Sequence, residues 1–236
     1  MTIRGHDVLA VVPARGGSKS IPRKNLKQVG GVSLVGRAAQ VAKSVPWIDA
    51  AVISTDDQEI AAEAVRHGLD APFLRPPELS GDTANSVDAW RHAWLSSEAH
   101  YGRRFELSIL LEPTSPLRRL EDVERTVAGM LDAGAHAAAT VSRTPAHYTP
   151  HKTLTVSADG RIGFYLEGGA RHSLRQGIPA LYHRNGLCYA VTRRHLVEQG
   201  MIIDRDALAI IVDRHVVNID DPFELELAEW LLDRGY

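Results

Sequence analysis

The chain contains one cysteine, Cys188, among 236 residues, so an internal disulfide is excluded. Cys188 lies in the apolar run 187–191, and this context predicts a buried, inert thiol. No apolar stretch approaches the roughly 20 residues that a membrane-spanning helix needs. The N-terminus reaches polar His6 and Asp7 without a signal-peptide pattern. These absences predict a cytoplasmic protein that works without a membrane.

Several catalytic signatures are also missing. The sequence has no Gly-x-x-x-x-Gly-Lys-Ser/Thr loop, no Gly-x-Gly-x-x-Gly fingerprint and no Gly-x-Ser-x-Gly elbow. Basic and acidic residues nearly balance, at 27 and 29, so the whole molecule is not an electrostatic nucleic-acid binder. We therefore expect no nucleic-acid partner, and any anion site has to be local.

The most informative segment that is present follows the apolar run 8–12, which reads as a buried parallel strand. Residues 14–26 form a glycine-containing loop with four cations, Arg15, Lys19, Arg23 and Lys24. The glycines allow close backbone approach, and amides and cations together suit phosphate oxygens. A solvated basic turn punctuated by Pro22 is the alternative. The position just past a strand's carboxyl end favours a polyphosphate site, because open α/β sheets bind ligands there.

Strand and helix patterns alternate along the chain, which predicts an α/β fold with three layers and a mostly parallel sheet. The expected strands are residues 8–12, 51–54, 107–111, 137–141, 187–191, 207–212 and 216–219. The expected helices are residues 34–44, 58–67, 83–98, 120–133 and 221–232, with Asp82 or Thr83 capping the third.

The alternation of strand and helix patterns stops between residues 143 and 185. A β-hairpin is expected there, formed by segments 152–156 and 161–166 around the turn Ser157-Ala158-Asp159-Gly160. The segment has too few apolar residues for its own core. We therefore expect one domain, residues 1–236, with 143–185 as an inserted lobe that covers a substrate or pairs with a second subunit.

Five polar loops follow strand ends and should share one sheet edge: 14–25, 54–57, 75–86, 112–118 and 218–221. Segment 75–83 leads into a helix N-terminus whose amides could read a base or ribose, although a capped helix behind a proline turn is the favoured interpretation of this segment by itself. Asn218, Asp220 and Asp221 offer oxygen ligands for Mg²⁺, while Asp221 followed by Pro222 also reads as a helix cap.

Taken together, the motifs of this chain resemble those of the acylneuraminate cytidylyltransferases and of their relatives that act on other 2-keto-3-deoxy sugar acids. The resemblance covers nearly the whole length. The motifs that carry it are Ala14-Arg15-Gly16-Gly17-Ser18-Lys19, Pro22-Arg23-Lys24-Asn25-Leu26, Ser54-Thr55-Asp56, Arg75-Pro76-Pro77-Glu78-Leu79, Asp82-Thr83-Ala84, Glu112-Pro113-Thr114-Ser115-Pro116-Leu117-Arg118, Asn185-Gly186 and Asn218-Ile219-Asp220. The resemblance implies a Rossmann-like nucleotidyltransferase fold, dependence on Mg²⁺, CTP and a sugar acid as substrates, and a homodimer that uses the inserted lobe.

The residues and the resemblance together give the predicted site. Nucleotide binding is expected at Ala14, Arg15, Gly16, Gly17, Ser18, Lys24, Asn25, Arg75, Asp82, Ala84 and Ser86, with Arg15, Lys24 and Asp220 as the catalytic set. Sugar binding is expected at Glu112, Lys152, Arg175, His183, Arg184 and Tyr189, and metal binding at Asn218, Asp220 and Asp221.

This sequence departs from the family pattern at three places. Asn218 replaces one carboxylate of the usual Asp-x-Asp metal pair, and Glu112 stands where sialic acid enzymes carry Gln. His183 occupies the position of an arginine, with Arg184 displaced by one residue. A carboxylate at position 112 could accept hydrogen bonds from hydroxyls or pair with an amino group.

The predicted activity is transfer of a cytidylyl group from CTP to a nonulosonic acid of the sialic, legionaminic or pseudaminic type, with release of pyrophosphate. The alternatives are a cytidylyltransferase for the eight-carbon acid of lipopolysaccharide, transfer to a sugar 1-phosphate, and a nucleotide-binding protein that has lost catalysis, for which Asn218 is the motivation.

Overall fold

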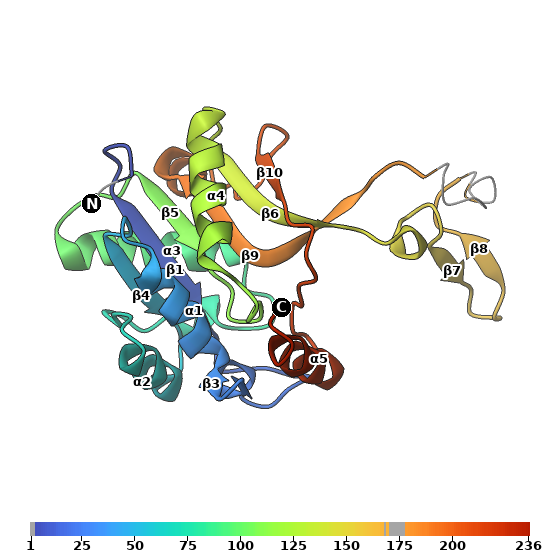
Figure 1. Cartoon of the computed structure of the whole chain (residues 1–236), viewed down its shortest axis with the longest axis horizontal. Helices are drawn as coiled ribbons and strands as arrows, with labels where there is room; N and C mark the ends of the chain where they lie inside the picture. The colour runs from blue at the N-terminus through green and yellow to red at the C-terminus, as the bar shows by residue number, and fades with distance from the viewer. Residues whose placement is uncertain (1–2, 168, 170–177) are drawn as a thin grey trace.

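A central six-stranded sheet organises the computed structural model, which describes residues 3–167, 169 and 178–236 (Figure 1). The strand order is β10-β6-β9-β5-β1-β4. The strands are β1 (Val8–Pro13), β4 (Ala50–Ser54), β5 (Leu107–Leu110), β6 (Ala137–Arg143), β9 (Tyr182–Thr192) and β10 (Leu208–Ile211). Strand β1 pairs in parallel with β4 and β5, and β10 with β6, whereas β9 runs antiparallel between β5 and β6. The expected mostly parallel sheet is confirmed, with β9 as the antiparallel member.

Helices cover both faces of this sheet, which gives the predicted three layers (Figure 1). On one face, Val8, Ala10 and Val12 pack with α1 (Leu34–Ser44), α2 (Gln58–Arg66) and α4 (Leu120–Asp132). On the other face, Leu9 and Val11 pack with α3 (Ser86–Tyr101) and the π-helical turn η6 (Arg194–Glu198). The alternation follows from the period of two along a strand, and burial on both sides explains why β1 is apolar throughout.

Side-chain caps set where several helices begin. Ser33, Asp57, Asn85 and Asp221 each accept a backbone N–H from the first turn of α1, α2, α3 and α5 (Pro222–Leu232), respectively. Such caps satisfy amides that have no partner inside the helix. The expected cap at Asp82 or Thr83 is therefore wrong: α3 starts at Ser86, and Asn85 is its cap.

The expected strand at 216–219 is also wrong, because this segment has no ladder pairing in the structure. Val217 and Ile219 are buried against α5 in a separate apolar cluster, and the amide of Ile219 bonds the carbonyl of Thr114 at 2.8 Å. Alternating burial can thus come from packing under a helix as well as from a sheet. No helix among the described residues is long and apolar enough to cross a membrane.

Segment 143–185 forms an arm, in its described part, that projects from the body (Figure 1). Strands β6 and β9 lead into it, and η3 (Ala146–Tyr148), β7 (Leu154–Val156) and β8 (Ile162–Phe164) lie toward its far end. Strands β7 and β8 pair antiparallel, as expected from the sequence. Short elements complete the fold: η1 (Lys24–Leu26), η2 (Pro77–Leu79) and the pair β2 (Gln28–Val29) and β3 (Val32–Ser33).

Candidate active site

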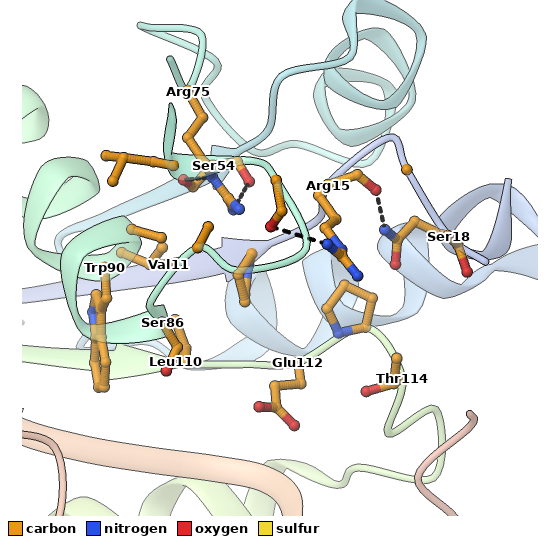
Figure 2. A pocket seen from close by; sticks show the side chains of 18 of the residues that line it. Val11, Arg15, Ser18, Ser54, Arg75, Ser86, Trp90, Leu110, Glu112 and Thr114 are labelled. Atoms are coloured by element: carbon orange, nitrogen blue, oxygen red, sulfur yellow. Dashed lines mark hydrogen bonds between the residues drawn. The ribbon is translucent and has the colours of Figure 1, made fainter. Parts of the chain in front are cut away.

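A cavity of about 370 Å³ opens at the carboxyl edge of the parallel strands (Figure 2). The loops that follow β1 and β5, the end of β4 at Ser54 and the loop that precedes α3 form it together with the N-terminus of α3. The position agrees with the strand-end argument. The predicted site residues that line it are Arg15, Gly17, Ser18, Lys24, Asn25, Arg75, Asp82, Ala84, Ser86 and Glu112. Residues far apart in the sequence therefore meet in one place.

Arg15 reaches into this cavity from the loop after β1 (Figure 2). Its Nη1 donates to the carbonyl of Gly81 at 3.1 Å and to Asp82 Oδ1 at 3.0 Å. Lys19 Nζ lies 2.6 Å from the other oxygen of Asp82. Hydrogen bonds from Lys19 and Arg15 lower the pKa of the Asp82 carboxyl, so Asp82 stays an anion between two cations.

The backbone of the same loop is held by two side chains. The Gly16 amide donates to Asp56 Oδ1 at 2.8 Å, and Asn25 Nδ2 donates to the Arg15 carbonyl at 2.9 Å. Gly16 also passes close to α2, because a Cβ there would lie 3.0 Å from the Cβ of Asp57. Ala14 is buried beneath the loop. Neither Ala14 nor Gly16 lines the cavity, so both shape the loop from behind.

Lys24 lies largely buried on the side of the loop nearest α5. Its Nζ donates to the carbonyl of Ile219 at 2.8 Å and lies 3.3 Å from Asp220 Oδ1. The hydroxyl of Ser20 donates to the Asp220 carbonyl. These contacts bring the predicted metal segment to the basic loop. Arg23 turns outward instead and pairs with Glu59 at 2.7 Å.

Arg75 supplies a second, buried cation on the opposite wall. Its Nε donates to Ser54 Oγ at 3.0 Å, and the guanidinium also donates to the Ser54 carbonyl. Burial lowers the pKa of Arg75 from its usual value, while nearby Asp56 acts in the other direction. A guanidinium fixed by the end of β4 can present its remaining donors to a ligand in a set direction.

The first turns of α3 form the cavity's apolar side. Ser86, Ala89 and Trp90 lie at helical spacing and all line the cavity. Trp90 is buried, and its indole Nε1 donates to Ser108 Oγ at 2.9 Å. The sequence prediction included Ser86 and missed Trp90, although the positions i, i+3 and i+4 of the helix could have identified it.

Glu112 lies across the cavity from Arg75 and Arg15 (Figure 2). Arg118 supports its backbone, because this fully buried guanidinium donates to the carbonyls of Glu112, Gly186 and Leu187. Burial lowers the pKa of Arg118 to about 10. The Glu112 carboxylate accepts no hydrogen bond from the described residues. Burial raises its pKa, against the opposing effects of Arg118 and Arg184.

The second position of the Asn185-Gly186 pair requires a glycine. Its φ is +72°, and a Cβ there would lie 2.4 Å from Glu112 Oε2 and 2.6 Å from Ser115 Oγ. Asn185 is buried and donates to Ser142 Oγ at 3.0 Å, while Ser115 donates to its carbonyl. The pair therefore fixes the start of β9 against the loop after β5.

A second cavity, of about 330 Å³, lies beside the first on the sheet. Tyr189 separates them, because it pairs in register with Leu110, which lines the first cavity, and with Ala139, which lines the second. Burial raises the pKa of Tyr189 to about 12. The lining of the second cavity is Ala139, Val141, Tyr182, Arg184, Ile203, Ala207, Leu208 and Ala209. Of the predicted sugar-binding residues, Arg184 lines this cavity and Tyr189 lies between the two cavities, whereas the aliphatic wall was not predicted.

Two predicted sugar-binding residues, Lys152 and His183, are not brought to these cavities. Lys152 follows η3 on the arm, which extends away from the body (Figure 1). His183 lies where β9 enters the arm, with its Nδ1 3.0 Å from the hydroxyl of Thr144. Arg175 lies outside the described residues.

The predicted metal segment offers a small set of oxygen donors. Asn218 Oδ1 is buried and has no hydrogen-bond partner among the described residues, and the Asp220 side chain is 81% exposed beside Lys24. Asp221 is committed to capping α5, where its Oδ1 accepts the amide of Glu224 at 2.9 Å. The described residues contain no cluster of three or more His, Cys, Asp or Glu side chains that could hold a metal alone. The donors fit Mg²⁺ only if phosphates complete the shell, which is how Mg²⁺ commonly binds.

Comparison with known proteins agrees with this geometry. A family model described as Cytidylyltransferase matches residues 9–200. Post-translational flagellin modification protein B of Campylobacter coli is 26% identical over 227 residues, which cover 96% of this chain and 95% of that protein. CMP-N,N'-diacetyllegionaminic acid synthase of Legionella pneumophila is 26% identical over 237 residues, with 96% of each chain covered.

A solved structure of CMP:2-keto-3-deoxy-manno-octonic acid synthetase complexed with CTP shares the fold. Its TM-score is 0.71 at 19% identity, and the match covers 98% of this chain and all of that one. The family match spans most of the sequence, including the basic loop, the α3 N-terminus and the Glu112 segment. The chain belongs to the cytidylyltransferase family.

Proposed function

We propose that this protein transfers the cytidylyl group of CTP to a nonulosonic acid, forming a CMP-sugar and pyrophosphate. The observation that carries the proposal is the position of two adjacent cavities on either side of Tyr189, one with the basic loop and one with an apolar wall and Arg184. The relative named CMP-N,N'-diacetyllegionaminic acid synthase supports a legionaminic-type acid as the first substrate to test.

The first cavity suits CTP in one orientation. Arg15 and Lys24 provide charge for the triphosphate, and the amides of Gly17 and Ser18 lie on the same wall. The cytidine then lies toward Arg75, Ser86 and Trp90, where buried donors and an aromatic side chain can hold a base. We infer that this end of the cavity selects the nucleotide.

The second cavity suits the sugar acid. Arg184 there can pair with the carboxylate, and Tyr189 lies between this space and the nucleotide cavity. Glu112 lines the first cavity, and the described residues donate no hydrogen bond to its carboxylate, so a ligand can do so. A sugar hydroxyl or amide N–H is the type of group that would satisfy it.

The reaction on this geometry is an in-line attack by the anomeric hydroxyl on the α-phosphorus, with pyrophosphate as the leaving group. The residues position the reactants and stabilise charge, Arg15 at the α-phosphate and Lys24 at the departing pyrophosphate. Asn218 and Asp220 would hold Mg²⁺ together with phosphate oxygens, and Mg²⁺ would supply charge neutralisation there.

We further propose a homodimer built through the arm. On the β7–β8 hairpin, Leu154 is opposite Phe164 and Val156 is opposite Ile162, and all four side chains are exposed. A second copy of the chain would cover this apolar face and bring Lys152 toward a site. The cytoplasm, where nucleoside triphosphates are available, stays the predicted location.

The test is a panel of 2-ulosonic acids, assayed with each of the four nucleoside triphosphates and Mg²⁺ while pyrophosphate release is measured. We expect release with CTP and a nine-carbon acid. Preference for the eight-carbon octulosonic acid would favour the alternative that the shared fold of the octonic acid synthetase raises. CTP binding without release for any acid would indicate a nucleotide-binding protein that has lost catalysis.

A further inference from the structure

Carboxylates of other loops already contact the phosphate-binding donors of the loop after β1. Asp56 accepts the Gly16 amide, Asp82 pairs with Arg15 and Lys19, and Asp220 lies beside Lys24. Of these three acids, Asp82 is the one that lines the nucleotide cavity. A carboxylate and a phosphate both accept hydrogen bonds from cationic N–H donors, so the two groups compete for the same donors.

We propose that Asp82 is an internal competitor of the nucleotide's phosphates. The competition arises because the triphosphate can engage Arg15 and Lys19 only by displacing the Asp82 carboxylate. Asp82 then weakens CTP binding. By taking Arg15 back from the α-phosphate and Lys19 back from pyrophosphate, it assists the release of the products. The inference rests on the proposed function, since it requires the triphosphate to bind at Arg15.

The segment that carries Asp82 is suited to such an exchange. Gly81 and Asp82 lie in an exposed turn between η2 and α3, closed by a hydrogen bond from the Ala84 amide to the Gly81 carbonyl. No atom lies within 4 Å of a Cβ built on Gly81, so the turn is not packed there. Arg15 contacts both Gly81 and Asp82, and its transfer to a phosphate would release both contacts together.

The expected effect is moderate. The Arg15 and Asp82 side chains are 39% and 50% exposed, and exposed ion pairs are individually weak. Because Asp82 faces two cations, we expect Asp82→Asn to bind Mg²⁺-CTP and Mg²⁺-pyrophosphate about three- to tenfold more tightly. The gain should shrink as salt is added, since salt screens the interaction.

The experiment is calorimetric titration of the full-length wild type, Asp82→Asn and Asp82→Ala with both ligands at low and high ionic strength. Product inhibition by pyrophosphate is measured in parallel, and both variants should be inhibited at lower concentrations. Glu59→Gln is the matched control, because it removes one negative charge that pairs with Arg23 of the same loop outside the cavity. Glu59→Gln should leave both affinities unchanged.

Three outcomes would overturn the proposal. Equal or weaker binding by both folded Asp82 variants would assign Asp82 a structural or ligand-contacting role. Tighter binding by Asp82→Asn alone would assign the gain to the new amide, and an equal gain in Glu59→Gln would assign it to net charge. The proposed function is tested separately, because failure of every sugar acid to release pyrophosphate in the wild type leaves these binding measurements intact.

Discussion

At the scale of single residues, Arg15 and Arg23 are two cations of one loop with different surroundings. Arg15 faces the cavity, whereas Arg23 pairs with Glu59. We expect Arg15→Gln to lower the rate of pyrophosphate release on the order of 10²-fold, because charge stabilisation in the transition state is lost. Arg23→Gln should keep most of the rate. Similar rates for the two variants in the ulosonic acid assay would contradict the role of Arg15.

Glu112 gives a pH-dependent prediction. Its pKa is raised in the folded protein by burial, so folding favours the protonated form. The folded chain then binds more protons than the unfolded chain between the ordinary and the raised pKa, and stability falls as pH rises through that window. Glu112→Gln removes this loss. At pH 8 we expect the melting temperature of Glu112→Gln to exceed that of the wild type. The difference between the two melting temperatures should vanish at about pH 4 or below, where glutamate is protonated in both the folded and the unfolded chain.

Differential scanning fluorimetry across pH measures this effect, and the comparison of the two proteins cancels the other titrating groups. A lower melting temperature for Glu112→Gln at pH 8 would show that the carboxylate stabilises the fold.

Gly186 should be intolerant of even a methyl group. Gly186→Ala places a Cβ within 2.4 Å of Glu112 Oε2 at a positive φ, and we expect about 2 to 4 kcal/mol of lost stability. Gly200→Ala is the control, since its φ is +68° with no atom within 4 Å. The control should lose only about 1 kcal/mol. Chemical denaturation of the two variants isolates the packing cost, and equal losses would show that backbone conformation alone accounts for it.

At the scale of elements, the start of α5 places a helix cap next to the proposed metal ligand. Asp221 caps the helix, whereas Asp220 points to solvent beside Lys24. We expect Asp221→Ala to cost about 1 kcal/mol of stability with little change in the Mg²⁺ concentration needed for activity. Asp220→Asn should raise that Mg²⁺ requirement while the melting temperature is kept. Unchanged Mg²⁺ dependence in Asp220→Asn would remove this residue from the metal site.

Strands, helices and loops could be predicted from the sequence where the pattern that marks them is a contiguous run of residues. The apolar run at β1 and the glycine-containing basic loop after it are contiguous, and both were identified correctly. The start of α3 was misplaced because Asp82, Thr83 and Asn85 are all good caps, and only the fold selects one. The wall around Ile203 was missed because aliphatic residues carry no chemical signature until packing brings them beside Arg184.

At the scale of the whole molecule, the arm allows a test of the dimer. Val156 and Thr155 are neighbours on opposite faces of the β7–β8 hairpin, and Val156 belongs to the exposed apolar face. We expect Val156→Asp to weaken self-association about tenfold or more, because an interface would bury an unpaired charge. Thr155→Asp should associate normally. Sedimentation measures both, and a wild type that stays monomeric at all concentrations would contradict the proposal.

The long strand β9 links the two parts of the molecule. Its first residues pair with β6 at the base of the arm, the pairing register shifts opposite Ala139 and Val141, and Tyr189 then lies between the two cavities. Gly186, at a φ of +72°, lies within this irregularity, so the strand bends between the arm and the body. Arg184 and Tyr189 lie on either side of this bend, so a partner bound to the arm would act on the second cavity through one irregular stretch of a single strand.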